Sequence, residues 1–132
     1  MKYITITAFI HFCLYAFASF VMLGIFSRLY LWLTPYDELK QIKEGITAPA
    51  IAFGGALLGF TFPLLSVSYT GVNFFDFLVW GVVAGALQLI AFKVIYWAIP
   101  MEIEKNNTAI ATLYASLAVC VGLINAFSLI PQ

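Results

Sequence analysis

Residues 45–75 read GITAPAIAFGGALLGFTFPLLSVSYTGVNFF, and no side chain in this stretch is charged. Three further uncharged runs cover residues 3–27, 77–92 and 106–132. A helix needs about 20 apolar residues to cross the ~30 Å hydrocarbon core of a bilayer. The run at 77–92 becomes long enough if Lys93 extends its ammonium toward the membrane surface. We therefore predict an all-α integral membrane protein, with transmembrane helices at about 3–33, 46–69, 77–99 and 108–130.

The overall composition leads to the same fold class. Hydrophobic residues make up 64% of the chain, charged residues make up 9%, and the mean hydropathy is +1.02. Globular proteins average about 45–50% apolar and about 25% charged residues. Because six basic and six acidic residues cancel, no basic field attracts nucleic acid, and we expect the lipid bilayer as the partner instead. No linker is long enough to form a domain, so residues 1–132 form one transmembrane domain.

The basic residues predict the orientation in the membrane. The linkers 34–45 and 100–107, with the helix ends beside them, carry Arg28, Lys40, Lys43, Lys93 and Lys105, and the opposite side carries only Lys2. Positive side chains are retained on the cytoplasmic face. We therefore expect a multi-pass membrane protein with both termini outside the cytoplasm. A cleaved signal peptide is less favoured, because the apolar run continues well past the possible cleavage site at residues 16–18.

The two halves of the sequence resemble each other. An offset of 65 residues pairs Arg28 with Lys93, Trp32 with Trp97 and Pro35 with Pro100. An offset of 61 then pairs residues 47, 48 and 50 with residues 108, 109 and 111. These matches predict pseudo-repeats at about 3–69 and 70–132, each one helical hairpin. Hairpins of the same sense form parallel repeats about an axis along the membrane normal.

Small residues recur at helical spacing and predict close helix packing. The residues concerned are Gly55, Gly59, Gly81, Gly85, Ala115 and Gly122. Surfaces of this kind let helix backbones approach closely in lipid. They favour packing within the four-helix unit, and a seam between copies in a homo-oligomer is the alternative. The two cysteines, Cys13 and Cys120, lie deep in apolar runs and are interpreted as small core residues. Asp76 is expected to cap the third helix, and Asn107 or Thr108 the fourth.

Few polar residues lie at membrane depth, where each is costly unless it faces protein or water. They include His11, Gln88 and Asn125. We interpret Gln88 and Asn125 first as interhelical hydrogen-bonding groups, and His11 as locally bonded, for example to Tyr15. The other interpretation is a pore or polar network formed by these three residues with the helix starts at Thr47, Asn107 and Thr108.

The sequence gives no support for catalysis. The acidic residues Asp37, Glu38, Glu44, Glu102 and Glu104 lie in short charged linkers and are interpreted as solvated helix ends. No GxSxG, HExxH or phosphate-binding glycine loop is present. We therefore expect no enzyme activity, no cofactor and no metal site.

Both halves also resemble a known family. The segments KEGITAPAIAFGGALLGFTFPL and EKNNTAIATLYASLAVCVGLINAF are similar to the YjfL-like bacterial inner-membrane proteins, whose shared region is called domain of unknown function 350. The most specific parts are Asn107, Thr108 and Ala109, their echo at Thr47 and Ala48, and the stretch 55–63. The resemblance implies a four-helix plasma-membrane protein, encoded near envelope-stress modules, and supplies no catalytic residues.

Two functions from different classes remain. The favoured one is a homo-oligomeric membrane scaffold, an envelope-stress-associated unit that binds a peripheral protein on the cytoplasmic side. Its partner surface would include Lys40, Lys43, Glu44, Glu104 and Lys105. The alternative is a small channel or transporter for an ion or small solute.

Overall fold

The computed structural model describes residues 6–34, 38–69, 73–100 and 106–129, and most of these are helical. It contains four helices that are long and apolar enough to cross a membrane. These are α1 (Ile6–Leu33), α3 (Thr47–Tyr69), α4 (Phe74–Ala98) and α5 (Thr108–Ser128). The short helix α2 (Glu38–Lys43) lies between α1 and α3 in the chain. The predicted all-helical class is therefore confirmed.

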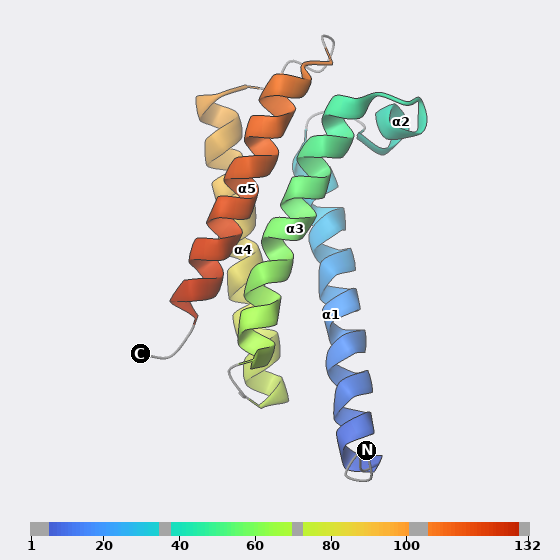
Figure 1. Cartoon of the computed structure of the whole chain (residues 1–132), viewed down its shortest axis with the longest axis vertical. Helices are drawn as coiled ribbons and strands as arrows, with labels where there is room; N and C mark the ends of the chain where they lie inside the picture. Colours follow the sequence, from blue (N-terminus) through green and yellow to red (C-terminus); the bar gives the residue numbers. More distant parts are fainter. Residues whose placement is uncertain (1–5, 35–37, 70–72, 101–105, 130–132) are drawn as a thin grey trace.

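Helices α3, α4 and α5 form a close group, and α1 stands beside it (Figure 1). Helices α3 and α5 run in the same direction and make the most extensive contact in the molecule, whereas α4 packs on both of them. Helix α1 lies against α3 and α4, and its N-terminal part extends beyond the other helices. The two chain ends lie at the same end of the bundle, and α2 lies at the opposite end.

Large apolar side chains cover the outside of the molecule. On α1, the side chains of Phe12, Phe17 and Phe20 are each more than two-thirds exposed. In water such a surface would aggregate, but in lipid it needs no cover, because hydrocarbon is as apolar as the side chains. The backbone of each helix satisfies its own hydrogen bonds, as a chain segment inside a bilayer must. The exposed apolar surface therefore supports an integral membrane protein.

Glycines bring α3 and α5 into backbone contact. A Cβ atom placed on Gly122 of α5 would overlap the backbone of Gly59, and one placed on Gly55 of α3 would overlap the backbone of Ala115. Small residues allow this approach, which gains dispersion contacts that larger side chains would prevent. Gly81 and Gly85 of α4 instead face side chains, those of Met22 and Phe60. Within one copy, the small residues of α3 and α5 thus allow backbone contact, whereas those of α4 make room for side chains of α1 and α3.

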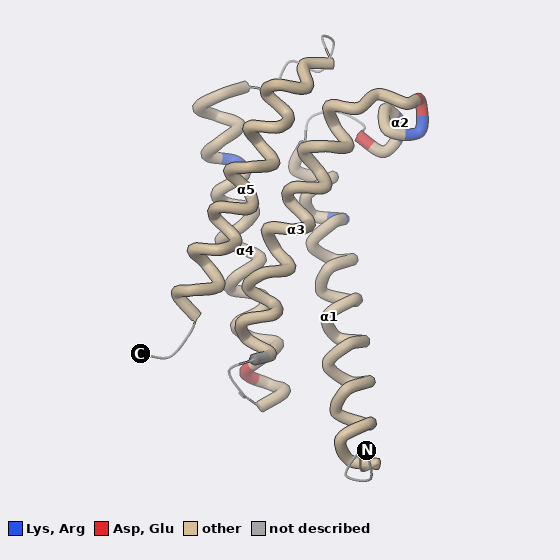
Figure 2. The backbone as a smooth tube through the Cα atoms, in the orientation of Figure 1, with Lys and Arg blue, Asp and Glu red and all other residues tan. Residues whose placement is uncertain are grey.

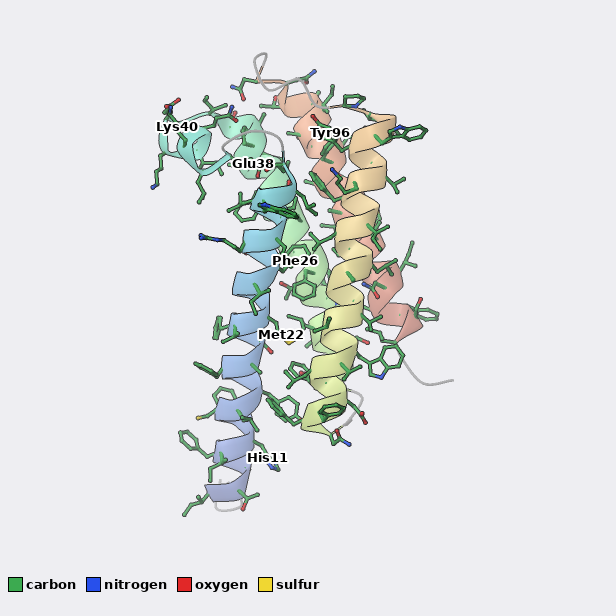
Figure 3. The ribbon with its side chains drawn as sticks, turned by 180° about the vertical axis from the view of Figure 1, so that it is seen from behind. His11, Met22, Phe26, Glu38, Lys40 and Tyr96 are labelled. Carbon is green, nitrogen blue, oxygen red and sulfur yellow. The ribbon has the colours of Figure 1, made fainter. Side chains whose placement is uncertain are left out.

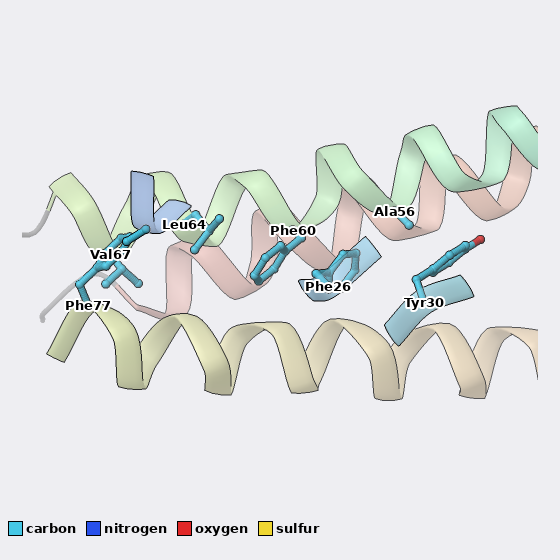
Figure 4. Packing of buried hydrophobic residues seen from close by; sticks show 8 residues of the cluster. Phe26, Tyr30, Ala56, Phe60, Leu64, Val67 and Phe77 are labelled. Atoms are coloured by element: carbon cyan, nitrogen blue, oxygen red, sulfur yellow. The ribbon is translucent and has the colours of Figure 1, made fainter. Parts of the chain in front are cut away.

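Aromatic rings fill the space where α1 meets α3 and α4 (Figure 4). Phe26 of α1 stacks on Phe60 of α3, with ring centres 4.5 Å apart. Tyr30 stacks on Phe53 at 5.2 Å and packs against Phe92 at 4.6 Å. Stacked and tilted ring pairs at these distances are attractive beyond the area they bury. Aromatic contacts therefore hold the C-terminal half of α1 against α3 and α4.

Helix α4 begins earlier than the sequence predicts. Its N-cap is Asn73, whose Oδ1 accepts a hydrogen bond from the backbone N–H of Asp76, 2.9 Å away. The interpretation of Asp76 as the cap is therefore wrong, and the helix starts at Phe74 rather than at 77. Asp76 lies in the first turn, where its carboxylate faces the partial positive charge of the helix start. At α5 the predicted cap is confirmed as Asn107.

Candidate functional site

Two buried amide side chains connect α4 and α5 inside the bundle. Nε2 of Gln88 donates a hydrogen bond to the backbone oxygen of Ala118, 2.8 Å away, and the side chain is 4% exposed. Nδ2 of Asn125 donates to the backbone oxygen of Ala84, 3.1 Å away. A buried polar group is costly unless it is hydrogen-bonded. Each bond therefore gives a buried amide a partner, and it also joins α4 to α5. The predicted interhelical bonding is confirmed, with backbone carbonyls as the acceptors.

The centre of the bundle beside Gln88 is almost filled. A cavity of about 20 Å³ lies there, and its lining is mainly apolar and aromatic, including Phe26, Phe92 and Tyr114. This volume is the size of one water molecule. The Oε1 atom of Gln88 is buried and has no hydrogen-bond partner among the described residues. The cavity is therefore far too small for a solute to pass through.

A third interhelical bond joins α3 to α5 next to Asn125. The Ser66 hydroxyl donates to the backbone oxygen of Ala126, 2.7 Å away. The polar side chains of Gln88, Asn125 and Ser66 therefore hold α3, α4 and α5 to one another.

His11 lies apart from these buried groups. It is exposed on the N-terminal part of α1, near the end of that helix that extends beyond the bundle (Figure 3). The structure therefore brings Gln88 and Asn125 to one helix interface and leaves His11 outside it. A pore formed by all three side chains within one copy does not match this arrangement.

Two adjacent asparagines accept hydrogen bonds from the first turns of two different helices. Oδ1 of Asn107 accepts from the backbone N–H of Ile110 in α5, 3.2 Å away. Oδ1 of Asn106 accepts from the backbone N–H of Ala48 in α3, 2.9 Å away. The first N–H groups of a helix have no partner inside the helix. The pair therefore holds the starts of α3 and α5 together, with Thr47 exposed beside it.

The role of Asn106 can be tested with Asn106→Gly. The backbone at Asn106 has a φ of 44°, which glycine adopts without steric cost, so the substitution removes mainly the side-chain acceptor. We expect the free energy of unfolding to fall by about 1 kcal/mol, with faster amide hydrogen exchange in the first turn of α3. Asn107→Gly should instead speed exchange at the start of α5. Equal effects of both variants on α3 would contradict the assignment.

The charged residues of the described part of the chain lie mostly toward the α2 end of the molecule (Figure 2). Lys40 and Lys43 lie on α2, and Glu44 follows it; all three are exposed. Glu104 and Lys105, the other members of the predicted partner surface, lie outside the described residues. The structure thus places the described part of that surface in one cluster, at the same end as the starts of α3 and α5.

One acidic residue of this region is buried, which the sequence analysis missed. Glu38 is only 1% exposed, so its interpretation as a solvated helix end is wrong. Figure 3 shows its side chain directed to the bundle, whereas Lys40 points outward. The burial arises because α2 folds against α3. No motif in the sequence indicates that contact, since α2 has only six residues.

The cysteines also differ from their interpretation. Both Cys13 and Cys120 are free and exposed on the outer surface, so they are not core residues. Within the described ranges, no group of three or more His, Cys, Asp or Glu residues could hold a metal ion. The expected absence of cofactors and of enzyme activity stays a prediction.

Comparison with known proteins adds the family. A model of the Domain of Unknown Function DUF350 matches residues 3–129. The "UPF0719 inner membrane protein YjfL" of Escherichia coli strain K12 is 35% identical over 118 residues, which cover 87% of this chain and 89% of that protein. The protein of the same name from Escherichia coli O157:H7 matches equally well. No solved structure matches this chain.

The resemblance to this family is therefore confirmed over nearly the whole length of the chain. The four apolar helices agree with the names of these relatives, which describe inner-membrane proteins. This chain belongs to the DUF350 family.

Proposed function

We propose that this chain is a homo-oligomeric scaffold of the bacterial inner membrane, whose α2 end recruits a peripheral protein during envelope stress. The observation that carries the proposal is the distribution of polar side chains. The two buried amides are used between helices, whereas the exposed Lys40, Lys43 and Glu44 gather at one end. Such a molecule presents most of its charged groups to water at that end and mainly apolar surface along its helices.

The orientation in the membrane forms part of the proposal. Lys40 and Lys43 lie on α2, and Arg28 and Lys93 lie in the C-terminal parts of α1 and α4, which end toward the α2 end (Figure 1). This distribution favours that end as the cytoplasmic one. Both termini would then lie outside the cytoplasm. A reporter fused after Gln132 should be active on the outer side, and cytoplasmic activity of that fusion would overturn the orientation.

The outer face of α3 and α5 is the proposed seam between copies. A groove of about 570 Å³ runs along it, with small residues such as Ala50, Gly54 and Ser116 in its lining. A Cβ atom at Gly54 would meet nothing within 4 Å, so this face has room for a neighbouring helix. Small surfaces of this kind are typical of helix association in lipid.

Cys120 lines the same groove and provides a test. If two copies meet symmetrically there, mild oxidation in native membranes should form a disulfide between their Cys120 thiols. Cys13→Ala should keep the cross-linked dimer, and Cys120→Ala should lose it. The matched control is Cys13 on α1, which is also exposed. A dimer that depends on Cys13 instead would contradict this seam.

Recruitment at α2 has its own test. A photo-reactive amino acid at position 43 should cross-link a discrete protein in intact cells, and Lys40→Glu should weaken the product. Position 73, exposed at the opposite end of the bundle, is the control and should give no such product. Products from both positions, or from neither, would contradict recruitment at α2.

We also infer a duplicated hairpin. Helices α3 and α5 both begin at a threonine, Thr47 and Thr108. Two residues before each threonine, the backbone has a positive φ, which is 86° at Gly45 and 44° at Asn106. These positions are paired by the 61-residue offset. The packing differs between the halves, because α4 contacts both α3 and α5 whereas α1 lies against α3 and α4. Divergence after duplication accounts for that difference.

A small channel or transporter is the second candidate. The observation that favours it is the pair of helix N-termini at the α2 end, held together by Asn106. Helix N-termini carry partial positive charge and can attract an anion. The small cavity beside Gln88 argues against a path inside one copy, so a path would have to lie between copies.

A further inference from the structure

A long groove runs between α1 and α4 on the outside of the bundle. Its lower part has a volume of about 190 Å³ and lies between Met22, Ile25 and Leu29 of α1 and the facing side of α4. The α4 side is formed by Gly81, Val82, Gly85, Ala86 and Leu89. The side chains of Met22 and Phe60 lie over the two glycines, so the channel that remains between the helices is shallow and runs past Val82 and Ala86, which are exposed.

The groove continues to the α2 end of the molecule. An open part of about 520 Å³ is lined by Leu33 of α1 and by Leu89, Ile90, Lys93, Val94 and Trp97 of α4. Leu89 lines both parts, so the second part lies next to the first along α4. From Gly81 to Lys93, at 1.5 Å per residue, the groove follows α4 for about 18 Å. Half of a bilayer's hydrocarbon core is about 15 Å thick, so the length suits one acyl chain.

The end of the groove carries a positive charge. Lys93 is exposed, and none of the described residues that line the groove is acidic. Lys93 lies five residues before the end of α4 at Ala98, close enough for its ammonium to reach the membrane surface. Trp97, one turn further on, is 83% exposed, as is typical of a tryptophan at the level of the lipid headgroups.

We propose that this groove binds an anionic phospholipid of the surrounding membrane. One acyl chain would lie along Val82, Ala86 and Leu89, and the phosphate would accept a hydrogen bond from Nζ of Lys93. The positive charge at the end of the groove complements an anionic headgroup, which favours this occupant over the apolar helix of a second copy. Basic pockets between transmembrane helices recognise anionic headgroups in the same way.

Native mass spectrometry of the purified full chain tests the proposal. The protein in detergent is mixed with equal amounts of phosphatidylglycerol and phosphatidylethanolamine that carry the same acyl chains. We expect the wild type to retain phosphatidylglycerol in preference. Lys93→Gln should lower the retention of phosphatidylglycerol about fivefold, which is the effect of removing one lysine near an anionic lipid. Lys93→Arg, which keeps the positive charge, should retain phosphatidylglycerol as the wild type does. Arg28→Gln, which removes an exposed basic residue that does not line the groove, should retain the wild-type level.

A second variant tests the acyl-chain part of the groove. Ala86 is exposed and lines the lower part, so Ala86→Trp should fill the channel and lower the retention of both lipids, with an unchanged circular-dichroism spectrum. Equal retention of phosphatidylglycerol by the wild type and Lys93→Gln would overturn the proposal. Unchanged lipid retention by Ala86→Trp would overturn the proposal as well. A wild-type dimer that Ala86→Trp dissociates would also overturn it, because a second copy of the chain would then occupy the groove.

Discussion

Replacing Gly122 with alanine is expected to destabilise the bundle by about 3 kcal/mol, the upper end of the usual range for overfilled cores. The added methyl group would overlap the backbone of Gly59 in α3. A flexible side chain could move away, but a helix backbone cannot, so α3 and α5 must separate. Denaturant or thermal unfolding in detergent micelles, followed by circular dichroism, measures the loss.

Gly24→Ala is the matched control for this change. Gly24 also lies inside a transmembrane helix, and a Cβ atom there would meet nothing within 4 Å. Both substitutions gain the same helix propensity, up to about 1 kcal/mol, so the difference between them isolates the clash. If Gly122→Ala unfolds at the same midpoint as Gly24→Ala, the close α3–α5 seam is wrong.

Replacing Gln88 and Asn125 together with leucine is expected to cost about 2 kcal/mol, the sum of two interhelical hydrogen bonds in a membrane protein. Leucine has a similar size, so the change removes the bonds to Ala118 and Ala84 with little change in packing. Cross-linking or fluorescence between α4 and α5 should also report a weaker contact. The same unfolding assay gives the free energy.

Thr112→Val is the control for that pair. Thr112 is exposed on α5, and its hydroxyl donates to the backbone oxygen of Thr108 in its own helix, 2.7 Å away. Its removal should change stability by less than about 0.5 kcal/mol. A double variant as stable as Thr112→Val would show that the buried amides do not hold α4 to α5.

Hydropathy predicted the helices well because the bilayer leaves few alternatives. A chain in hydrocarbon must satisfy every backbone group internally, so the uncharged runs correspond closely to α1, α3, α4 and α5. The start of α4 was missed because Asn73 and Asp76 can both cap a helix. The choice between them depends on whether Phe74 and Phe75 join the helix, which local sequence does not decide.

The candidate site was less predictable, because its key contacts join distant parts of the chain. Asn106 caps a helix that begins 59 residues earlier, at Thr47, and neither segment indicates the other. Glu38 is buried only through the placement of α2 against α3. Gln88 and Asn125 were found because amides at membrane depth need partners, yet the carbonyls that accept from them could not be named from the sequence.

The measurement that tests the account most directly is solute flux in liposomes that contain the purified chain. Potassium, proton and small-anion flux would be followed with entrapped dyes, against protein-free liposomes and against Gln88→Leu. If the buried amides serve only to hold the helices together and the bundle is closed, flux should match the protein-free vesicles in every case. Sustained flux through the wild type that Gln88→Leu abolishes would contradict the scaffold as a complete account.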